Sequence, residues 1–297
     1  MRAELDHLPQ SKQRELAHVT RVLIEEFEAA HALGTQKWKK AGRVFKLVLY
    51  GSYARGDWVD DPVGGYQSDY DILIVVSDER LAEFEFWSAA DDRLMRDTTI
   101  TKALSAPVNF IVHTLTDVNQ QLEKGRPFFV DIVEQGIALY QAEGFPFAQP
   151  RDLPPEEARA EARRHLDHWL PLSENALSLA LTSMRNGVER DAAFLMHQAA
   201  ERAYHCLLLV LTLYSPKSHR LRFLRSQAEE VAPDLVAAWP RADRFSRRCF
   251  ELLREAYVNA RYSPKYEITE AELCWLAERV KVLQTLVKRA SEARFEC

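Results

Sequence analysis

The stretch that decides the fold of this chain spans residues 49–76 and reads LYGSYARGDWVDDPVGGYQSDYDILIVV. It contains the end of one predicted strand, a sharp turn at Gly51-Ser52, an acidic glycine-rich loop and a second predicted strand with Asp69 and Asp71. A Gly-Ser turn close to an Asp-x-Asp strand can hold a nucleoside triphosphate and the metal ions on its phosphates. The stretch therefore predicts a site for a triphosphate and a metal.

The two aspartates are expected to be metal ligands. Asp69 and Asp71 are two residues apart on the predicted strand, so both carboxylates point to the same side of it. Such groups repel each other unless a cation lies between them, and Mg²⁺ prefers oxygen ligands that bridge to phosphate oxygens. Two metal ions held in this way would align an attacking hydroxyl with the α-phosphate and stabilise the leaving pyrophosphate.

The Gly-Ser turn is expected to bind the phosphates. Gly51 lets the backbone turn tightly, Ser52 offers a hydroxyl and a backbone N–H, and Arg55 adds positive charge one turn later. Each half of the pattern also has an ordinary explanation, because Gly-Ser turns are common and Asp-x-Asp often marks a strand end or a calcium-type loop. The combination on consecutive strands is much more specific.

The composition is typical of a soluble globular protein with room for two domains. The chain has 297 residues, of which 47% are hydrophobic and 28% charged. It has no apolar run of about 18 residues that would predict a membrane-spanning helix, and no apolar signal region at its start. The cysteines form no CxxC pair, and the first three are expected to be buried thiols, which favours a reducing, cytoplasmic setting. They are Cys206, Cys249, Cys274 and Cys297.

Charge is distributed unevenly along the chain. Residues 1–150 carry 16 Lys and Arg against 23 Asp and Glu, whereas residues 151–297 carry 23 against 21. The acidic first half suits metal binding. The mildly basic second half is only weak support for a polyanionic partner.

The first half alternates predicted helices and strands, which indicates an α+β or α/β sheet domain. Its second strand is apolar on both faces beyond the aspartates, as expected for a covered central strand. Thr116 is expected to cap one helix, and Gly136 to end another. The predicted helices span 9–32, 79–97 and 127–135, and the predicted strands span 44–50, 70–76, 108–114 and 137–140.

A proline-rich segment separates the two halves. Residues 143–155 contain four prolines, a density that breaks both helix and sheet. We therefore expect a sheet domain over 1–142, a linker over 143–155 and an all-α antiparallel helical bundle over 156–297. In this bundle Thr269 and Glu272 form a predicted capping box. Its predicted helices span 156–185, 188–213, 218–230, 241–260 and 269–294.

The motif residues carry a family resemblance. Residues 51–56 (GSYARG) and 68–75 (SDYDILIV) resemble the minimal nucleotidyltransferases of the DNA polymerase β superfamily, which include kanamycin nucleotidyltransferase. The resemblance implies a polymerase-β-like mixed sheet with flanking helices. It also implies that the Gly-Ser turn binds an NTP, with ATP the first candidate, and that the two aspartates bind Mg²⁺. The implied reaction transfers a nucleoside monophosphate to an acceptor.

The chain departs from the family in the spacer between the serine and the first aspartate, which is longer than usual. We expect the extra residues to form a loop at the mouth of the site, where they would contact the acceptor. The spacer covers residues 53–68 and includes Asp57, Asp60, Asp61, Gly64 and Gly65.

The second departure concerns the third carboxylate, which the family places on a later strand as metal ligand or general base. Asn109 occupies the matching position on the predicted strand 108–114. An amide accepts hydrogen bonds but takes no proton and supplies no charge to a cation. The site would then be weakened, use a substitute base such as His113 on the same strand face, or bind nucleotide without turnover.

The second half resembles HEPN domains over about 156–290. Residues 192–205 (AAFLMHQAAERAYH) resemble the core helix of that family, and 217–221 (KSHRL) and 260–264 (ARYSP) match two further landmarks in order. Some HEPN domains are metal-independent RNases with an Arg-x4–6-His motif, and Arg190 and His197 meet that spacing. The alternative is that His197 packs inside the bundle or its dimer face. Because HEPN bundles commonly pair, we expect a homodimer.

Two basic runs in the second half are candidates for contact with RNA or nucleotide, although most such runs are solvated helix faces. The first comprises His219, Arg220, Arg222 and Arg225, and the second comprises Arg241, Arg244, Arg247, Arg248 and Arg254.

Three functional hypotheses follow. The leading one is a cytoplasmic, Mg²⁺-dependent nucleotidyltransferase that acts on a protein, RNA or small-molecule acceptor and is coupled to a HEPN bundle. The second is a nucleotide-binding pseudoenzyme that regulates a HEPN RNase or RNA-binding module, as in toxin–antitoxin systems. The third, an aminoglycoside nucleotidyltransferase, rests on fold analogy alone. None of the three involves a membrane.

Overall fold

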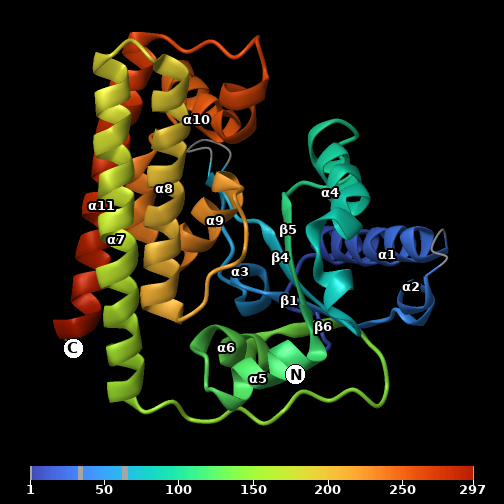
Figure 1. Ribbon diagram of the computed structural model, residues 1–297. Helices are drawn as coiled ribbons and strands as arrows, with labels where there is room; N and C mark the ends of the chain where they lie inside the picture. The colour runs from blue at the N-terminus through green and yellow to red at the C-terminus, as the bar shows by residue number, and fades with distance from the viewer. Residues whose placement is uncertain (1, 33–35, 62–65, 297) are drawn as a thin grey trace. The chain divides into compact units, whose positions relative to one another are not determined.

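The structure is a computed structural model that describes residues 2–32, 36–61 and 66–296 (Figure 1). The chain divides into two compact units, Met1–Leu153 and Pro154–Cys297. Within the described ranges, every helix is too short or too polar to cross a membrane. The architecture is α+β, with a mixed sheet in the first unit and helices throughout the second.

The first unit is built on a four-stranded sheet with the strand order β5-β4-β1-β6. Strand β1 (Val44–Tyr50) runs antiparallel to β4 (Tyr70–Val76) and to β6 (Ile137–Gln141). Strand β5 (Val108–Thr114) runs parallel to β4, which makes the sheet mixed. Every residue of β4 is buried, as its apolar sequence predicted for a central strand. All four predicted strands are confirmed, and β6 is one residue longer than expected.

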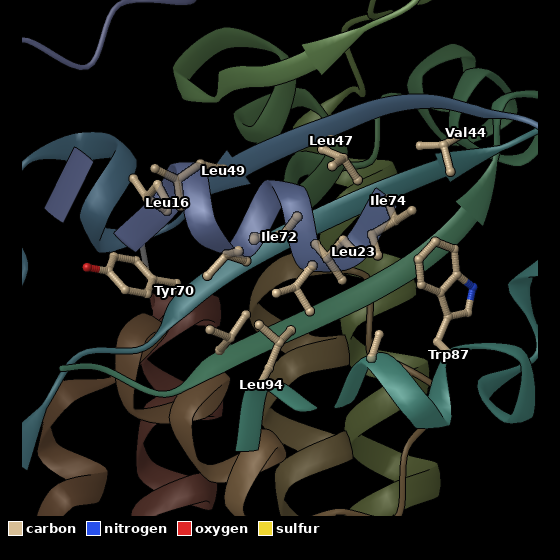
Figure 2. Packing of buried hydrophobic residues seen from close by; sticks show 14 of the residues in the cluster. Leu16, Leu23, Val44, Leu47, Leu49, Tyr70, Ile72, Ile74, Trp87 and Leu94 are labelled. Atoms are coloured by element: carbon tan, nitrogen blue, oxygen red, sulfur yellow. The ribbon is translucent and has the colours of Figure 1, made fainter. Parts of the chain in front are cut away.

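One face of this sheet is covered by α1 (Gln10–Ala32) and α4 (Phe84–Thr99). Figure 2 shows Leu16 and Leu23 of α1 in one cluster with Tyr70 and Ile72 of β4. The side chains of a strand alternate between faces, so every second residue of β4 reaches this apolar core. The aspartate between Tyr70 and Ile72 is therefore directed to the opposite face of the sheet.

Two predictions for helix ends in the first unit are wrong. The predicted helix 79–97 is broken, because Leu81 O accepts the Trp87 indole N–H at 2.7 Å and the chain is extended at Glu83. The helix after β5 is capped by Thr114, whose hydroxyl accepts the Asp117 N–H, and not by Thr116. The remaining elements of the unit are α2 (Lys37–Ala41), α3 (Ser52–Arg55), β2 (Asp60–Asp61), β3 (Tyr66–Gln67), the 3-10 helix η1 (Glu79–Ala82), α5 (Leu115–Glu123) and α6 (Pro127–Gln135).

The segment 143–153, which the sequence predicts to be part of a linker, packs on the first unit. The rings of Phe145 and Phe45 stack with their centroids 3.8 Å apart. The backbone N–H of Ala148 donates to the Asn119 side chain at 2.8 Å, and that of Arg151 donates to Leu122 O at 3.0 Å. Prolines prevent regular structure in this segment, but its aromatic side chains and free N–H groups still find partners.

The second unit consists of five α-helices and a 3-10 helix in the described residues, and the predicted helices are confirmed with ends shifted by a few residues. Helix α8 packs against four other helices and has more buried residues than any other helix of the unit. Thr269 and Glu272 form the predicted capping box, with reciprocal hydrogen bonds of 2.8 and 3.3 Å. The elements are α7 (Pro155–Arg185), α8 (Glu189–Thr212), α9 (Leu221–Val231), η2 (Pro233–Ala238), α10 (Arg244–Tyr262) and α11 (Glu270–Glu296).

The cysteines follow the sequence prediction only in part. Cys206 and Cys249 are buried free thiols, as expected. Cys274 is exposed, because it lies on α11 outside the stripe of Leu273, Leu276 and Ala277 that packs into the unit. Cys297 lies outside the described residues.

Candidate functional site

The sheet brings the predicted site residues of the first unit into one row across three strands. Asp71 lies opposite Tyr50 in the antiparallel register of β1 and β4, and opposite Asn109 in the parallel register of β4 and β5. The Gly51-Ser52 turn follows Tyr50 directly. Tyr50 and Asn109, which are 59 positions apart in the chain, thus lie on the two sides of Asp71, where β1 ends and β4 begins.

Asn109 joins the two aspartates. Its Nδ2 donates to Asp69 Oδ2 at 2.8 Å and to Asp71 Oδ1 at 3.5 Å. Asp71 and Asn109 are 3% and 7% exposed, whereas Asp69 is half-buried. Asp69 lies one residue before β4, which begins at Tyr70 as predicted. Its carboxylate still approaches that of Asp71, because both accept from the Asn109 amide.

The turn between β1 and α3 needs the glycine that the sequence provides. Gly51 has φ 74° and ψ −156°, a conformation that side chains other than glycine rarely adopt. Two residues near the N-terminus hold the short helix that follows. Arg2 Nη2 donates to Ala54 O, and His7 Nε2 lies 2.9 Å from Tyr53 O. Neither contact was predicted, because nothing in the sequence pairs residues so far apart.

The predicted phosphate ligand Arg55 is the last residue of α3 and lies within the spacer. Its Nε donates to Asp57 Oδ2 at 3.2 Å, an exposed ion pair. The spacer forms the two-stranded sheet of β2 and β3, closed by hydrogen bonds between Val59 and Ser68 of 2.8 and 2.9 Å. Gly64 and Gly65 of the predicted acceptor loop lie outside the described residues.

The donor set at Asp69 and Asp71 fits a divalent cation. Two carboxylates converge on one point, where the Asn109 amide, with its partly positive N–H pair, donates to both of them. Carboxylate oxygens so arranged are the ligands that Mg²⁺ prefers. In the described residues no group of three or more His, Cys, Asp and Glu side chains is arranged to hold a metal, so this pair has no third carboxylate.

His113 is too far away to replace the missing carboxylate. It is four residues beyond Asn109 on β5, which corresponds to about 13 Å along a strand. Its Nδ1 lies 2.5 Å from Asp117 Oδ2 on α5. The hypothesis that His113 serves as a substitute base is therefore not supported by its position.

In the second unit, Arg190 has a structural role that the sequence motif does not indicate. Its guanidinium donates to Ala260 O at 2.9 Å, to Asn259 O at 3.1 Å and to Ser263 O. These carbonyls lie at the C-terminal end of α10, where the last turn of a helix leaves its C=O groups without helical partners. Arg190 therefore caps α10.

His197 is fully buried within the same unit. Burial, together with a smaller effect of the nearby His219, lowers its pKa to about 3, so the ring is neutral at physiological pH. Its Nδ1 lies 3.5 Å from Glu201 Oε2, and its ring lies 5.2 Å from that of Tyr257. The structure thus agrees with the alternative that His197 packs inside the bundle. The sequence spacing between Arg190 and His197 indicated neither the contacts of Arg190 with α10 nor the burial of His197.

A cluster around Glu201 is a feature that the sequence reasoning missed. The Glu201 carboxylate is buried on α8, and burial raises its pKa. His219 Nδ1 lies 3.0 Å from Oε1, His205 Nε2 lies 3.9 Å from the same oxygen, and Gln198 donates to Oε2 at 3.2 Å. The i, i+4 spacing of the α8 residues was visible in the sequence, but the approach of His219 from a loop was not.

Several arginines of the two predicted basic runs bind acidic partners within the unit. Arg225 and Arg241 both contact Glu229, at 2.6 and 2.7 Å, and Arg225 is itself buried. Arg248 contacts Glu272 at 2.7 Å, and Arg254 contacts Glu251 at 2.7 Å. These pairings reduce the charge that the runs could offer to a polyanion.

Comparison with known proteins agrees with this division of the chain. A family model described as a nucleotidyltransferase domain matches residues 35–138, and one described as a HEPN domain matches residues 166–290. A search of curated proteins found no match. The first match contains the turn, both aspartates and Asn109, and the second contains Arg190, His197 and Glu201. The chain therefore joins a nucleotidyltransferase domain to a C-terminal HEPN domain.

Proposed function

We propose that the first unit transfers a nucleoside monophosphate from an NTP, with ATP the first candidate, to an acceptor in the presence of Mg²⁺. The observation that carries this proposal is the convergence of Asp69 and Asp71 beside the Gly51-Ser52 turn. The nucleotidyltransferase family match supports an NTP substrate and a divalent metal.

Each residue has a role in this proposal. Asp69 and Asp71 would hold the cation, which would supply Lewis-acid stabilisation of the triphosphate. Gly51 allows the backbone to approach the phosphates, Ser52 offers its hydroxyl, and Arg55 adds positive charge at the rim. The acidic spacer would contact the acceptor, whose class is protein, RNA or small molecule.

The test is transfer of radiolabel from α-labelled ATP, with Mg²⁺, to the protein itself, to RNA or to aminoglycosides. We expect Asp69→Asn and Asp71→Asn to abolish transfer, because each removes a metal ligand. Asp92→Asn, which removes an exposed carboxylate from α4, should leave it intact. Absence of transfer by the wild type to every acceptor, or full transfer by the Asp71 variant, would end the proposal of catalysis.

A second candidate is nucleotide binding without turnover, in which the first unit regulates the HEPN unit. It is favoured by Asn109, because an amide that donates to both aspartates supplies neither negative charge nor a base at the third position. Equilibrium binding of ATP with Mg²⁺, dependent on Asp71 but accompanied by no transfer, would establish it. Lack of both binding and transfer would exclude both candidates.

The HEPN unit carries the proposals about partners. We expect it to pair into a homodimer, and a monomer in light scattering at micromolar concentration would contradict this. We also propose that the HEPN unit contacts RNA and that the protein is cytoplasmic. The burial of His197 and the engagement of Arg190 with α10 do not favour RNA cleavage by these two residues.

A further inference from the structure

On the face of the sheet opposite the aspartates, a polar network lies behind the candidate site. Glu15 of α1 is its centre. Glu15 Oε2 accepts the Tyr70 hydroxyl at 3.0 Å and the Ser105 N–H at 3.0 Å, and Oε1 accepts the Ser105 hydroxyl at 2.8 Å. Figure 2 shows Tyr70 on the side of β4 that faces α1, together with Leu16, the residue after Glu15.

This network contacts both strands that carry the candidate site residues. Tyr70 lies between Asp69 and Asp71, so its hydroxyl extends from the same few residues of β4 as the two carboxylates. Ser105 lies two residues before Pro107, where the chain enters β5 and reaches Asn109. The Tyr70 N–H donates to Pro107 O at 2.8 Å, so the two strand starts are also joined by their backbones.

Further contacts close the network around Glu15. Lys12, one turn earlier on α1, donates to the Ser105 hydroxyl at 2.5 Å and is buried. Gln67 donates to Ser105 O at 2.6 Å. Burial and the neighbouring Glu15 raise the pKa of Tyr70, so the phenol keeps the proton that it donates.

We infer that Glu15 is a positioning residue for the metal and nucleotide site. By accepting from Tyr70 and Ser105 together, it holds the start of β4 against the start of β5. It thereby sets the distance between the Asp69 and Asp71 carboxylates and Asn109. The role in metal binding rests on the proposed function, whereas the effect on Asn109 does not depend on it.

The role requires an acceptor at residue 15 and does not require a charge. In Glu15→Gln, the amide oxygen can take the place of Oε2 and accept from both Tyr70 and Ser105, while the NH₂ group donates to the Ser105 hydroxyl. Glu15→Ala removes every acceptor. Tyr70→Phe removes one donor and keeps the ring. Glu26→Ala is the matched control, because it removes a 2.8 Å contact to Arg93 from the same helix.

The first measurement is Mn²⁺ affinity in the presence of ATP, by titration calorimetry on the full chain. Groups that orient metal ligands typically contribute about 10–100-fold in affinity. We expect Glu15→Ala and Tyr70→Phe to weaken Mn²⁺ binding by about tenfold, the low end of this range. Glu15→Gln and Glu26→Ala should bind as the wild type does. The double variant with both Glu15→Ala and Tyr70→Phe should bind Mn²⁺ no more weakly than the weaker-binding of the two single variants. Both substitutions remove the same hydrogen bond between Tyr70 and Glu15.

The second measurement needs no metal, nucleotide or activity. The side-chain NH₂ group of Asn109 gives a pair of signals in a ¹H–¹⁵N spectrum, assigned by their loss in Asn109→Asp. We expect these signals to move in Glu15→Ala and Tyr70→Phe and to stay in place in Glu15→Gln and Glu26→Ala.

The two measurements separate the two claims. Unmoved Asn109 signals in Glu15→Ala and Tyr70→Phe would overturn the positioning role, as would a loss of Mn²⁺ affinity in Glu26→Ala equal to that in Glu15→Ala. A wild type that binds neither Mn²⁺ nor ATP would refute the proposed function, and the spectrum would still decide whether Glu15 positions Asn109.

Discussion

Single residues decide the chemistry that the first unit can perform. The Asp69 and Asp71 carboxylates share one amide donor, that of Asn109. An amide at this position donates to both carboxylates, whereas a carboxylate would add a ligand and repel both of them. In the proposed metal site, the balance between metal affinity and stability without metal therefore depends on residue 109.

Asn109→Asp should raise the affinity for Mn²⁺ in the presence of ATP by about tenfold, because a third charged oxygen ligand is added. Without metal the variant should melt at a lower temperature than the wild type, since three carboxylates then repel one another. Calorimetric titration and thermal denaturation with and without Mn²⁺ measure both effects. Asn109→Ala, which adds no charge, should not gain affinity, and an equal gain in the two variants would contradict the prediction.

His197 should make the stability of the protein depend on pH. Its pKa is about 3 when folded and near 6.5 when unfolded, so the unfolded chain binds the extra proton. The stabilisation is therefore complete above pH 6.5 and is lost as the pH falls toward 3. The raised pKa of Glu201 acts in the opposite direction.

The test compares the wild type with His197→Phe, which keeps an aromatic ring beside Tyr257. Between pH 6.5 and 5.5 the wild type should lose about 1 kcal/mol more free energy of unfolding than the variant. Urea denaturation at the two pH values measures this difference. Identical pH dependence in the two proteins would show that His197 does not titrate on unfolding.

At the scale of elements, hydrogen-bonding side chains at helix ends decide where several helices begin. Thr114 caps α5, Asp243 caps α10 through the Ser246 N–H at 2.8 Å, and Thr269 with Glu272 caps α11. Short-range patterns of this kind can be found in a sequence. Thr114 and Thr116 are both candidate N-terminal caps of α5. Which of them caps the helix depends on where the preceding strand ends.

Thr269→Ala should lower the free energy of unfolding by about 1 kcal/mol, because the Glu272 N–H at the start of α11 loses its acceptor. The matched control is Thr285→Ala, since Thr285 donates to Lys281 O on the exposed face of the same helix. The control should change the free energy by less than about 0.5 kcal/mol. Equal losses in denaturant unfolding of the two variants would argue against the cap.

At the scale of the whole molecule, the chain divides into two units that each bury their own apolar core. The sequence placed a break at the prolines of 143–155, and the division between Leu153 and Pro154 falls at the end of that stretch. The contacts of Phe145, Ala148 and Arg151 assign the segment before the division to the first unit.

A fragment ending at residue 153 should therefore be more stable than one ending at residue 142. We expect the shorter fragment to melt at least about 5 °C lower, because the ring stack and backbone hydrogen bonds of the segment contribute a few kcal/mol. Circular dichroism measures the melting temperatures. The complementary fragment 154–297 should melt cooperatively with a helical spectrum. Equal melting temperatures for the two N-terminal fragments would show that the segment does not stabilise the unit.

The sequence by itself determined most of the long helices and strands of this protein and the domain family of its first half. Strands β1, β4 and β5 were predicted with the bounds that the structure shows, because their apolar runs and flanking turns are local features. The combination of Gly51, Asp69 and Asp71 was equally local. The placement of Asn109 as a third position came from a family resemblance, and the parallel register of β4 and β5 brings it to Asp71.

Only the tertiary structure decided which distant residues meet. Glu15 reaches Tyr70 and Ser105, Arg190 caps a helix about seventy residues later, and His219 approaches Glu201 from a loop. No periodicity encodes such contacts, because they depend on how elements pack and not on the sequence of either partner alone. Burial has the same origin. His197 meets the Arg-x4–6-His spacing in the sequence, but its neutral charge state follows from the helices that enclose it.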